Sequence, residues 1–306
     1  MKGQRFAQFM ELRGRRVTEG AGSLWYSVPT TPRILMNSPL EGVIGADPGE
    51  IQDLLRQNGA LGARFPSSRL PGLESGLYVC RLKQFDIMTV HKKSRSCIRR
   101  GLEQCAFRQV EPNELLEQGL ILNRDSMNRQ GRYEAEFGEQ KQWARIVDAV
   151  KRCAGVEVWG TFLDGRLAAY AITLREDRWL HILHQFSQSE AFHAHPNDAL
   201  TYELTRMGAE DPALEAVCYG VVGLVATEGL HEYKLRHGYQ VEAVNSAFVY
   251  HPLAAPVLGS SLAAWAINEL RKRRPADQRL ERIAAVIEAG RRTRMNGAAQ
   301  LGSATI

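Results

Sequence analysis

The chain has no long hydrophobic run and no paired cysteines. Nowhere do apolar residues approach the roughly 18–20 in succession that a helix needs to cross a bilayer. The basic start, MKGQRFAQFMELRGRRV, is not followed by the apolar segment that marks a secretory signal. The five cysteines are odd in number and form no CxxC pair, which disfavours a disulfide framework or a zinc ribbon. These absences predict a cytoplasmic protein.

The composition is that of an ordinary globular protein with an uneven charge. Of 306 residues, 44% are hydrophobic and 24% charged, enough to build one large domain or two smaller ones. Nine basic residues face three acidic ones between positions 271 and 294, and HKKSRSCIRR at 91–100 forms a second basic cluster. Such clusters bind phosphates, acidic lipid headgroups or nucleic acid, or are solvated helix faces.

The hydrophobic pattern predicts a defined order of elements in the second half. Trp143, Ile146 and Val150 have helical spacing within EQKQWARIVDAVKRCAG. Two strands follow, joined by Asp164-Gly165, a strong hairpin signal, and a third strand completes an antiparallel meander. The expected strands are 156–163, 166–174 and 178–186, followed by a helix from Pro196 to Gly208, a strand at 214–220, a helix at 228–238 and a strand at 239–251.

Other segments show weaker patterns. The first twenty residues are expected to be frayed, and RDSMNRQGRY at 124–133 is expected to be a loop. A basic helix is predicted to end near Gly101. After residue 257 we expect two amphipathic helices and a disordered end at 296–306.

Three short segments carry a resemblance to a known family. They are KKSRSCIRRGLE at 92–103, RQGR at 129–132 and EGLHEYKLRHGY at 228–239. Their order, between about residues 25 and 250, resembles the GNAT fold, and more narrowly its Fem-like branch, whose founding members join amino acids to peptidoglycan precursors. The resemblance implies an α+β fold with a mixed, mostly antiparallel sheet flanked by helices.

The resemblance also implies a division of the chain. We expect an N-terminal region at 1–104, a GNAT domain at 105–256 and a basic helical tail at 257–306. Whether the N-terminal region is a degenerate second GNAT-like half stays open, because its sequence is short and irregular.

Two departures from ordinary acetyltransferases of this family bear on the donor. Their [QR]-x-x-G-x-[GA] loop, which holds the pyrophosphate of acyl-CoA, is replaced here by FHAHPND without a glycine. Their tyrosine four residues before the final glycine is replaced by Lys234. Both departures favour the Fem-like branch or an acyl-carrier donor.

The resemblance therefore implies an acyltransferase that forms an amide. The donor is acyl-CoA, acyl-carrier protein or aminoacyl-tRNA, and the acceptor is an amine on a small molecule or a cell-envelope precursor. The alternative is a catalytically silent GNAT-fold protein whose basic tail binds an acidic partner or makes peripheral contact with a membrane. Fold alone does not decide between them.

Three residues are candidates for catalysis. Lys234, which the resemblance places toward the cleft, could polarise a carbonyl or pair with a phosphate, although most lysines are simply solvated. His184 is a candidate general base because imidazole titrates near neutrality. Glu228 could accept the proton of the amine, or serve as the first-turn acid of its helix.

The candidates for binding are basic, aromatic or at a helix start. Arg95, Arg99 and Arg129 could hold a carboxylate or phosphate on the acceptor, and Tyr233 is a substrate-binding candidate that could equally be a core aromatic. Pro196 and Asn197 begin a helix whose N-terminus could bind donor phosphates. Asp198 opposes this, because a carboxylate repels a phosphate.

No metal is expected from the sequence. His181, His184, His193 and His195 gather within fifteen residues, and the pair at 193 and 195 could share one strand face. However, neither a cysteine nor an acid in a fixed ligand pattern completes the set.

Overall fold

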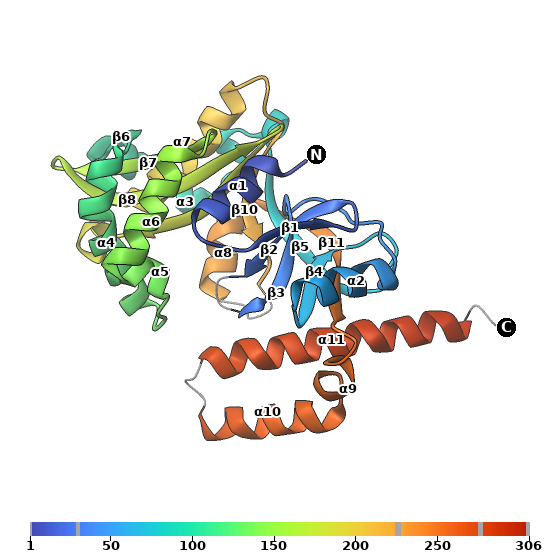
Figure 1. The fold of residues 1–306 in the computed structure, drawn as a ribbon. Helices are drawn as coiled ribbons and strands as arrows, with labels where there is room; N and C mark the ends of the chain where they lie inside the picture. The colour runs from blue at the N-terminus through green and yellow to red at the C-terminus, as the bar shows by residue number, and fades with distance from the viewer. Residues whose placement is uncertain (1, 29–30, 224–227, 275–277, 304–306) are drawn as a thin grey trace.

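The protein is built around one eleven-stranded sheet with helices on both faces (Figure 1). The computed structural model describes residues 2–28, 31–223, 228–274 and 278–303. The strand order is β1-β2-β3-β4-β11-β5-β10-β9-β8-β7-β6, and all neighbours are antiparallel except β3 with β4 and β9 with β10. The predicted mixed, mostly antiparallel sheet is confirmed. Among the described residues, no helix is long and apolar enough to span a bilayer.

The second half follows the predicted order of elements. Strands β7 (Val156–Leu163), β8 (Arg166–Glu176) and β9 (Trp179–Ser187) form the expected meander. Asp164 and Gly165 both have positive φ, 50° and 77°, which matches the tight hairpin their sequence predicts. The remaining elements are α7 (Pro196–Glu210), β10 (Ala216–Val221), α8 (Glu228–Arg236) and β11 (Gln240–Tyr250).

The first half repeats this connection pattern. Strands β1 (Val17–Gly20), β2 (Ser23–Val28) and β3 (Thr31–Ser38) form a meander, and α2 (Pro48–Asn58) leads to β4 (Gly62–Pro66), which is parallel to β3. That this region is a degenerate second GNAT-like half stays a prediction.

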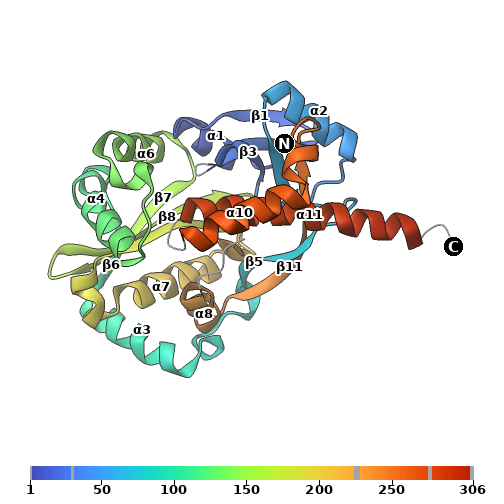
Figure 2. The same cartoon turned by 90° about the horizontal axis from the view of Figure 1, so that it is seen from below.

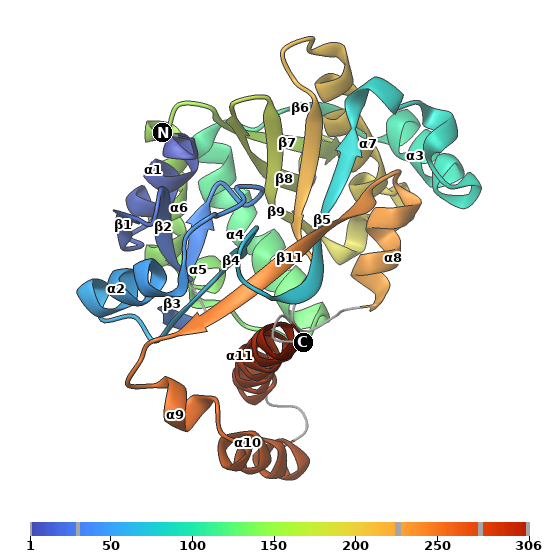
Figure 3. The ribbon, with the colours of Figure 1, turned by 90° about the vertical axis from the view of Figure 1, so that its right-hand side faces the viewer.

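The two halves exchange their last strands. Strand β5 (Leu73–Arg81) pairs with β10 of the second half, and β11 pairs with β4 of the first half. The exchanged strands also pair with each other through seven residues, Gln240↔Val79 to Ser246↔Leu73. Figure 3 shows β11 running across the molecule beside β5. The halves are therefore interlocked in one sheet.

Helices cover the sheet on both faces. Helices α1 (Gln4–Leu12), α4 (Pro112–Arg129) and α6 (Gln140–Arg152) bury Phe6, Leu115 and Trp143 with Phe186 of β9. On the other face, α7 buries Leu200 and Leu204 beside Tyr239. Helix α3 (Lys92–Gln104) packs on α7, and the short strand β6 (Ala106–Gln109) closes the sheet at one edge.

Two sequence-based expectations for the first 133 residues are wrong. The first twenty residues are ordered as α1 and β1, because Phe6 and Phe9 are fully buried by distant parts of the chain. The expected loop at 124–133 is helical as far as Arg129, because Ser126 and Met127 are buried. Ser126 Oγ donates to the Ser187 carbonyl at 2.8 Å, so a serine typical of loops is here a satisfied buried group.

The tail forms a helical hairpin beneath the sheet (Figure 2). After the short α9 (Ala255–Leu258) come α10 (Ser261–Arg273) and α11 (Gln278–Ser303). Tyr250 of β11 donates from its hydroxyl to the carbonyls of Val286 and Ile287 at 3.0 and 3.1 Å, which fixes α11 to the sheet. Helix α10 packs on the outer side of α11 (Figures 1 and 3). The expected disorder at 296–306 is wrong as far as Ser303, and 304–306 lie outside the described residues.

Candidate functional site

The parallel strands β9 and β10 separate partway along their length. They pair only through Ala216↔Trp179, Val217↔Leu180 and Cys218↔His181, although β9 continues to Ser187. The β10–β5 register shifts between Cys218 and Val221, and Gly220 has a φ of 84°. Glycine tolerates a positive φ better than any other residue. At Gly220 this φ turns β10 away from β9. We call the space beyond the last pair the strand gap.

Lys234 reaches the strand gap from α8. Its side chain is 7% exposed, and its Nζ donates to the carbonyl of Tyr219, the first β10 residue past the last β9–β10 pair, at 2.6 Å. The ammonium also lies 4.2 and 4.5 Å from the ring centroids of Tyr78 and Tyr219. Burial lowers the pKa of Lys234 from 10.5 to about 8. No ion pair to Lys234 is found within the described part of the chain.

A polar bridge crosses the strand gap beside Lys234. Tyr219 donates from its hydroxyl to Gln185 Oε1 at 2.5 Å, and Gln185 Nε2 donates to Asn197 and Thr201, each at 3.1 Å. The hydroxyl of Tyr233 lies 2.9 Å from both the Asn197 carbonyl and Thr201 Oγ1. The bridge connects β9, β10, α7 and α8 through side chains where the two strands no longer pair.

The start of α7 is held by the same bridge. Asn197 Nδ2 donates to Ser187 Oγ at 2.7 Å, and the Pro196 carbonyl accepts from Thr161 at 3.1 Å. Asp198, in the first turn, lies 3.0 Å from His237 Nε2. Both Asn197 amide atoms thus have partners, and a carboxylate lies where a donor phosphate would approach the helix N-terminus.

His184 lies on the opposite face of β9 from Gln185, as strand alternation requires. Arg13 Nη1 donates to His184 Nε2 at 2.9 Å, and the centroid of the His184 ring lies 4.6 Å from that of Phe137, with the two ring planes at 60°. Burial lowers the pKa of His184 well below its ordinary value, and the nearby Arg13, Arg132 and Arg15 lower it further. His184 is therefore neutral at pH 7, with the lone pair of Nε2 committed to Arg13.

Comparison with known proteins gives the family. Residues 89–255, more than half of the chain, match the acetyltransferase (GNAT) domain family. The chain belongs to the GNAT family. The predicted resemblance is confirmed, and none of the curated proteins matches the chain in sequence.

Three solved structures have a fold similar to that of this chain. FemX has a TM-score of 0.58 at 12% identity, over 84% of this chain and 93% of its own. The C-terminal domain of a putative lysylphosphatidylglycerol synthetase from Agrobacterium fabrum has a TM-score of 0.57 at 14% identity, over 86% of this chain and 92% of its own. L-PGS from Bacillus licheniformis has a TM-score of 0.55 at 15% identity, over 81% of this chain and 88% of its own. These similarities describe the fold.

The three predicted arginines of this GNAT protein lie on α3 and α4, whereas Lys234 lies on α8. Arg95 donates to the Val90 carbonyl at 3.0 Å, and Arg99 is exposed on the same helix, α3. Arg129, at the end of α4, donates to Asp125 and Ser189 at 3.2 and 2.9 Å. In the described part of the molecule no hydrogen bond connects these three arginines, so their joint role in substrate binding stays a prediction.

Two further predicted site residues, Glu228 and Tyr233, lie on α8. The backbone of Glu228 begins α8, but its side chain lies outside the described residues. Tyr233 is placed with its hydroxyl bound to α7 and its ring 4.1 Å from that of His237, a packing position between α7 and α8. Its contact with substrate stays a prediction.

Sequence reasoning missed a buried charged cluster on the His184 face. Glu136, on the short helix α5 (Ala135–Gly138), accepts from Arg13 at 3.0 Å and also pairs with Arg15. The side chain of Arg13 is 1% exposed. The sequence indicates this cluster only through the basic run RGRR at 13–16. That run lies in the segment that was expected to be frayed.

A separate surface cavity of about 820 Å³ lies between α4 and the β7–β8 turn. Its wall includes Gln118, Asp164 and Gln188, and it shares no lining residue with the Lys234 cluster or the polar bridge. We do not assign the transfer chemistry to this cavity.

Proposed function

We propose that this GNAT protein transfers an acyl or aminoacyl group from an activated donor to an amine acceptor and forms an amide. One observation supports the proposal most: Lys234 is buried at the strand gap, with no acidic partner among the described residues, between two tyrosine rings. A buried ammonium is costly unless paired. An anionic donor group would supply the missing partner.

In the proposed reaction the strand gap receives the activated carbonyl. The amine attacks the carbonyl carbon, the new C–N bond forms, and the bond to the leaving oxygen or sulfur breaks. Backbone N–H groups of β9 beyond the last pair would stabilise the oxygen that gains charge, an effect commonly worth about 3–4 kcal/mol. With a pKa of about 8, Lys234 is charged at pH 7 and can give its proton to the leaving atom.

The geometry favours aminoacyl-tRNA over donors with a pantetheine arm. Such an arm is an extended chain with two amides that would pair with open strand edges. Here the Tyr219–Gln185 hydrogen bond crosses the strand gap and would have to break. Asp198 at the start of α7 repels the pyrophosphate of acyl-CoA, whereas Lys234 can pair with a single phosphate. Acyl-CoA and acyl-carrier protein remain the competing donors.

The acceptor in this proposal is a small-molecule or cell-envelope precursor amine. Amines of this kind often carry carboxylates or phosphates, which guanidinium groups bind in pairs of hydrogen bonds. Arg95, Arg99 and Arg129 stay the candidates for this contact. Glu228 and His184 stay the candidates for removing the amine's proton, and His184 would first have to lose its contact with Arg13.

Thermal unfolding with a panel of donors tests the proposal. Coenzyme A, acyl-CoA, acyl-carrier protein and a non-hydrolysable aminoacyl-tRNA analogue are each added at concentrations far above an expected Kd. A ligand that binds the native state at 100 times its Kd stabilises that state by about 2.7 kcal/mol. This stabilisation raises the melting temperature. We expect the largest shift with the aminoacyl-tRNA analogue. No shift with any donor would contradict the proposal.

A second candidate function is supported by the outer face of α10. Leu262, Trp265 and Leu270 are exposed there, and Trp265 is 62% exposed. Lys272, Arg273 and Arg274 follow at the end of the helix and are exposed too. Apolar residues with a tryptophan beside basic residues suit the interface of an anionic membrane. In this alternative the protein is catalytically silent and binds the membrane through its tail.

Vesicle sedimentation separates the two candidates. The full chain is mixed with vesicles containing phosphatidylglycerol or only phosphatidylcholine, and compared with the double variant Leu262→Ser/Trp265→Ser. Selective binding to anionic vesicles that the variant loses, together with no response to any donor, would favour the alternative. A donor response without vesicle binding would exclude it.

A further inference from the structure

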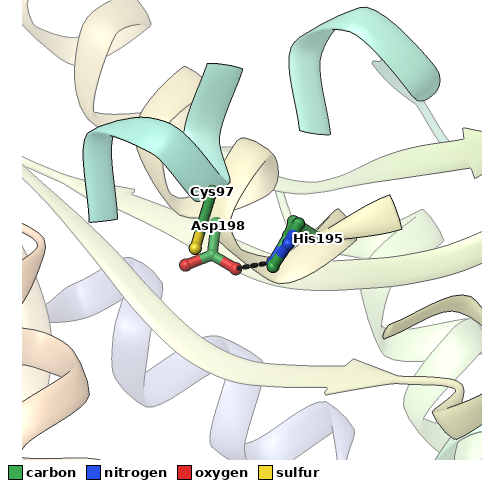
Figure 4. Close-up of side chains that lie close together, drawn as sticks. All are labelled: Cys97, His195 and Asp198. Carbon is green, nitrogen blue, oxygen red and sulfur yellow. Dashed lines mark ion pairs between the residues drawn. The ribbon is translucent and has the colours of Figure 1, made fainter. Parts of the chain in front are cut away.

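The fold brings together three metal-binding side chains that are distant in sequence. Cys97 lies on α3, His195 is the residue that precedes α7, and Asp198 lies in the first turn of α7. Their ligand atoms all lie within 4.8 Å of one another (Figure 4). His195 Nδ1 lies 3.5 Å from Asp198 Oδ2. The His193–His195 pair considered from the sequence is not the relevant set, because His193 instead contacts the Glu190 carbonyl at 2.9 Å.

A close helix contact creates this cluster. Gly101 lies one turn after Cys97 on α3, and a Cβ there would meet the His195 carbonyl at 2.6 Å and Ala199 Cβ at 2.8 Å. The glycine therefore lets α3 approach the start of α7 more closely than any other residue would. Residues four apart share one helix face. The same face thus places the Cys97 thiol beside His195 and Asp198.

The carboxylate of the cluster is held from behind. His237 Nδ1 faces the Tyr233 carbonyl at 2.7 Å, and its Nε2 faces Asp198 Oδ1 at 3.0 Å. Asp198 Oδ1 is fixed in this way, and Oδ2 remains on the side of His195. Hydrogen bonds of this kind orient carboxylate ligands around bound metals.

We propose that Cys97, His195 and Asp198 form a binding site for one zinc-type divalent ion. Thiolate sulfur, imidazole nitrogen and carboxylate oxygen are the three ligand types that zinc takes in proteins. Three protein ligands leave a fourth tetrahedral position for water or another oxygen donor, and all three residues are partly exposed, so the ion has a path of entry. On binding, the Cys97 thiol loses its proton to solvent and the sulfur–metal bond forms.

The site would connect three elements. The ion would join α3 to the start of α7, and the Asp198–His237 contact would extend the connection to α8, which carries Lys234. The site is inferred from its own geometry and does not depend on the proposed transfer reaction.

Metal binding to the purified full chain tests the inference. After chelator treatment the protein is loaded with zinc, desalted, and its metal content measured by mass spectrometry. Cobalt(II) replaces zinc in a parallel sample, because a cobalt–thiolate bond gives a charge-transfer absorption that free cobalt lacks. The variants are Cys97→Ser, His195→Ala and Asp198→Asn, and His193→Ala is the matched control, a neighbouring exposed histidine outside the cluster. Circular dichroism tests whether each variant is folded.

We expect one zinc per chain in the wild type and in His193→Ala. Each cluster variant should lose at least about 10-fold in zinc affinity, and Cys97→Ser should lose the cobalt–thiolate absorption. The inference is overturned if the wild type retains less than about one tenth of an equivalent. Unchanged binding in folded Cys97→Ser and His195→Ala would likewise overturn it, by showing that zinc binds elsewhere. If Asp198→Asn does not fold, these two variants still decide the question.

Discussion

At the scale of the residue, Lys234 combines three properties that most lysines lack. It is buried, it rests between two aromatic rings, and it donates to a main-chain carbonyl at the strand gap. The resemblance predicted that this residue faces the cleft, but neither the two tyrosines nor the polar bridge could be predicted. Tyr78 comes from the exchanged strand β5, about 150 positions away, and local patterns carry no information about such a contact.

Lys234→Met should separate function from stability. Methionine fills a similar volume without a charge, so the cost of burying the ammonium disappears. We expect the rate of transfer to fall by about 100-fold or more. The free energy of unfolding should stay unchanged or increase, by up to about 1–3 kcal/mol at pH 7. Denaturant unfolding and single-turnover transfer measure the two effects. An active variant would remove Lys234 from the mechanism.

The depressed pKa of Lys234 predicts an unusual dependence of donor binding on pH. The folded protein holds this proton with a pKa of about 8, whereas the unfolded chain holds it with 10.5. Binding of an anionic donor analogue should therefore weaken as pH rises through about 8. Stability should rise between pH 8 and 10.5, because there the unfolded state binds more protons. Lys234→Arg, which stays charged, should not show the change in binding; a wild-type profile flat up to pH 10 would contradict the prediction.

At the scale of the element, two helical glycines have opposite surroundings. Gly101 of α3 is pressed against α7, whereas a Cβ on Gly229 of α8 would meet no atom within 4 Å. Gly101→Ala should lower the free energy of unfolding by about 1–3 kcal/mol. Gly229→Ala should raise it by about 0.5–1 kcal/mol, because alanine is the better helix former.

Chemical denaturation of the two alanine variants measures this difference. Gly229→Ala is the control for the intrinsic effect of alanine in a helix, so the contrast reports the α3–α7 contact. Equal effects of the two substitutions would show that the contact is not tight. If Gly101→Ala is folded but destabilised, its zinc content should also fall, since it displaces Cys97 from the cluster.

Sequence patterns predicted elements well where periodicity and turn residues agreed. The meander from β7 to β9, with Asp164-Gly165 at its first turn, follows from local sequence alone. Helix α1 and the end of α4 were missed for the opposite reason, because distant contacts of Phe6 and Ser126 decide them. Cys97 could not be joined to His195 from sequence, since their contact depends on how two helices pack.

At the scale of the whole molecule, strand exchange joins the two halves. The sequence-based division at residue 104 separates β5 from both of its neighbours, β10 and β11. We expect a chain of residues 105–256 alone to lack a cooperative unfolding transition, because β10 and β11 then lose the strand between them. Circular dichroism during heating measures this. A cooperative transition in that fragment would show that the GNAT domain is autonomous.

The central claim is that Lys234 at the strand gap holds an activated donor. Isothermal titration calorimetry of a non-hydrolysable aminoacyl-tRNA analogue against wild type and Lys234→Met tests it most directly, without needing the acceptor. We predict that the wild type binds the analogue and that the variant binds it at least about 10-fold more weakly, a loss of about 1.4 kcal/mol. Equal affinity of the two proteins, or no binding by the wild type, would contradict the claim.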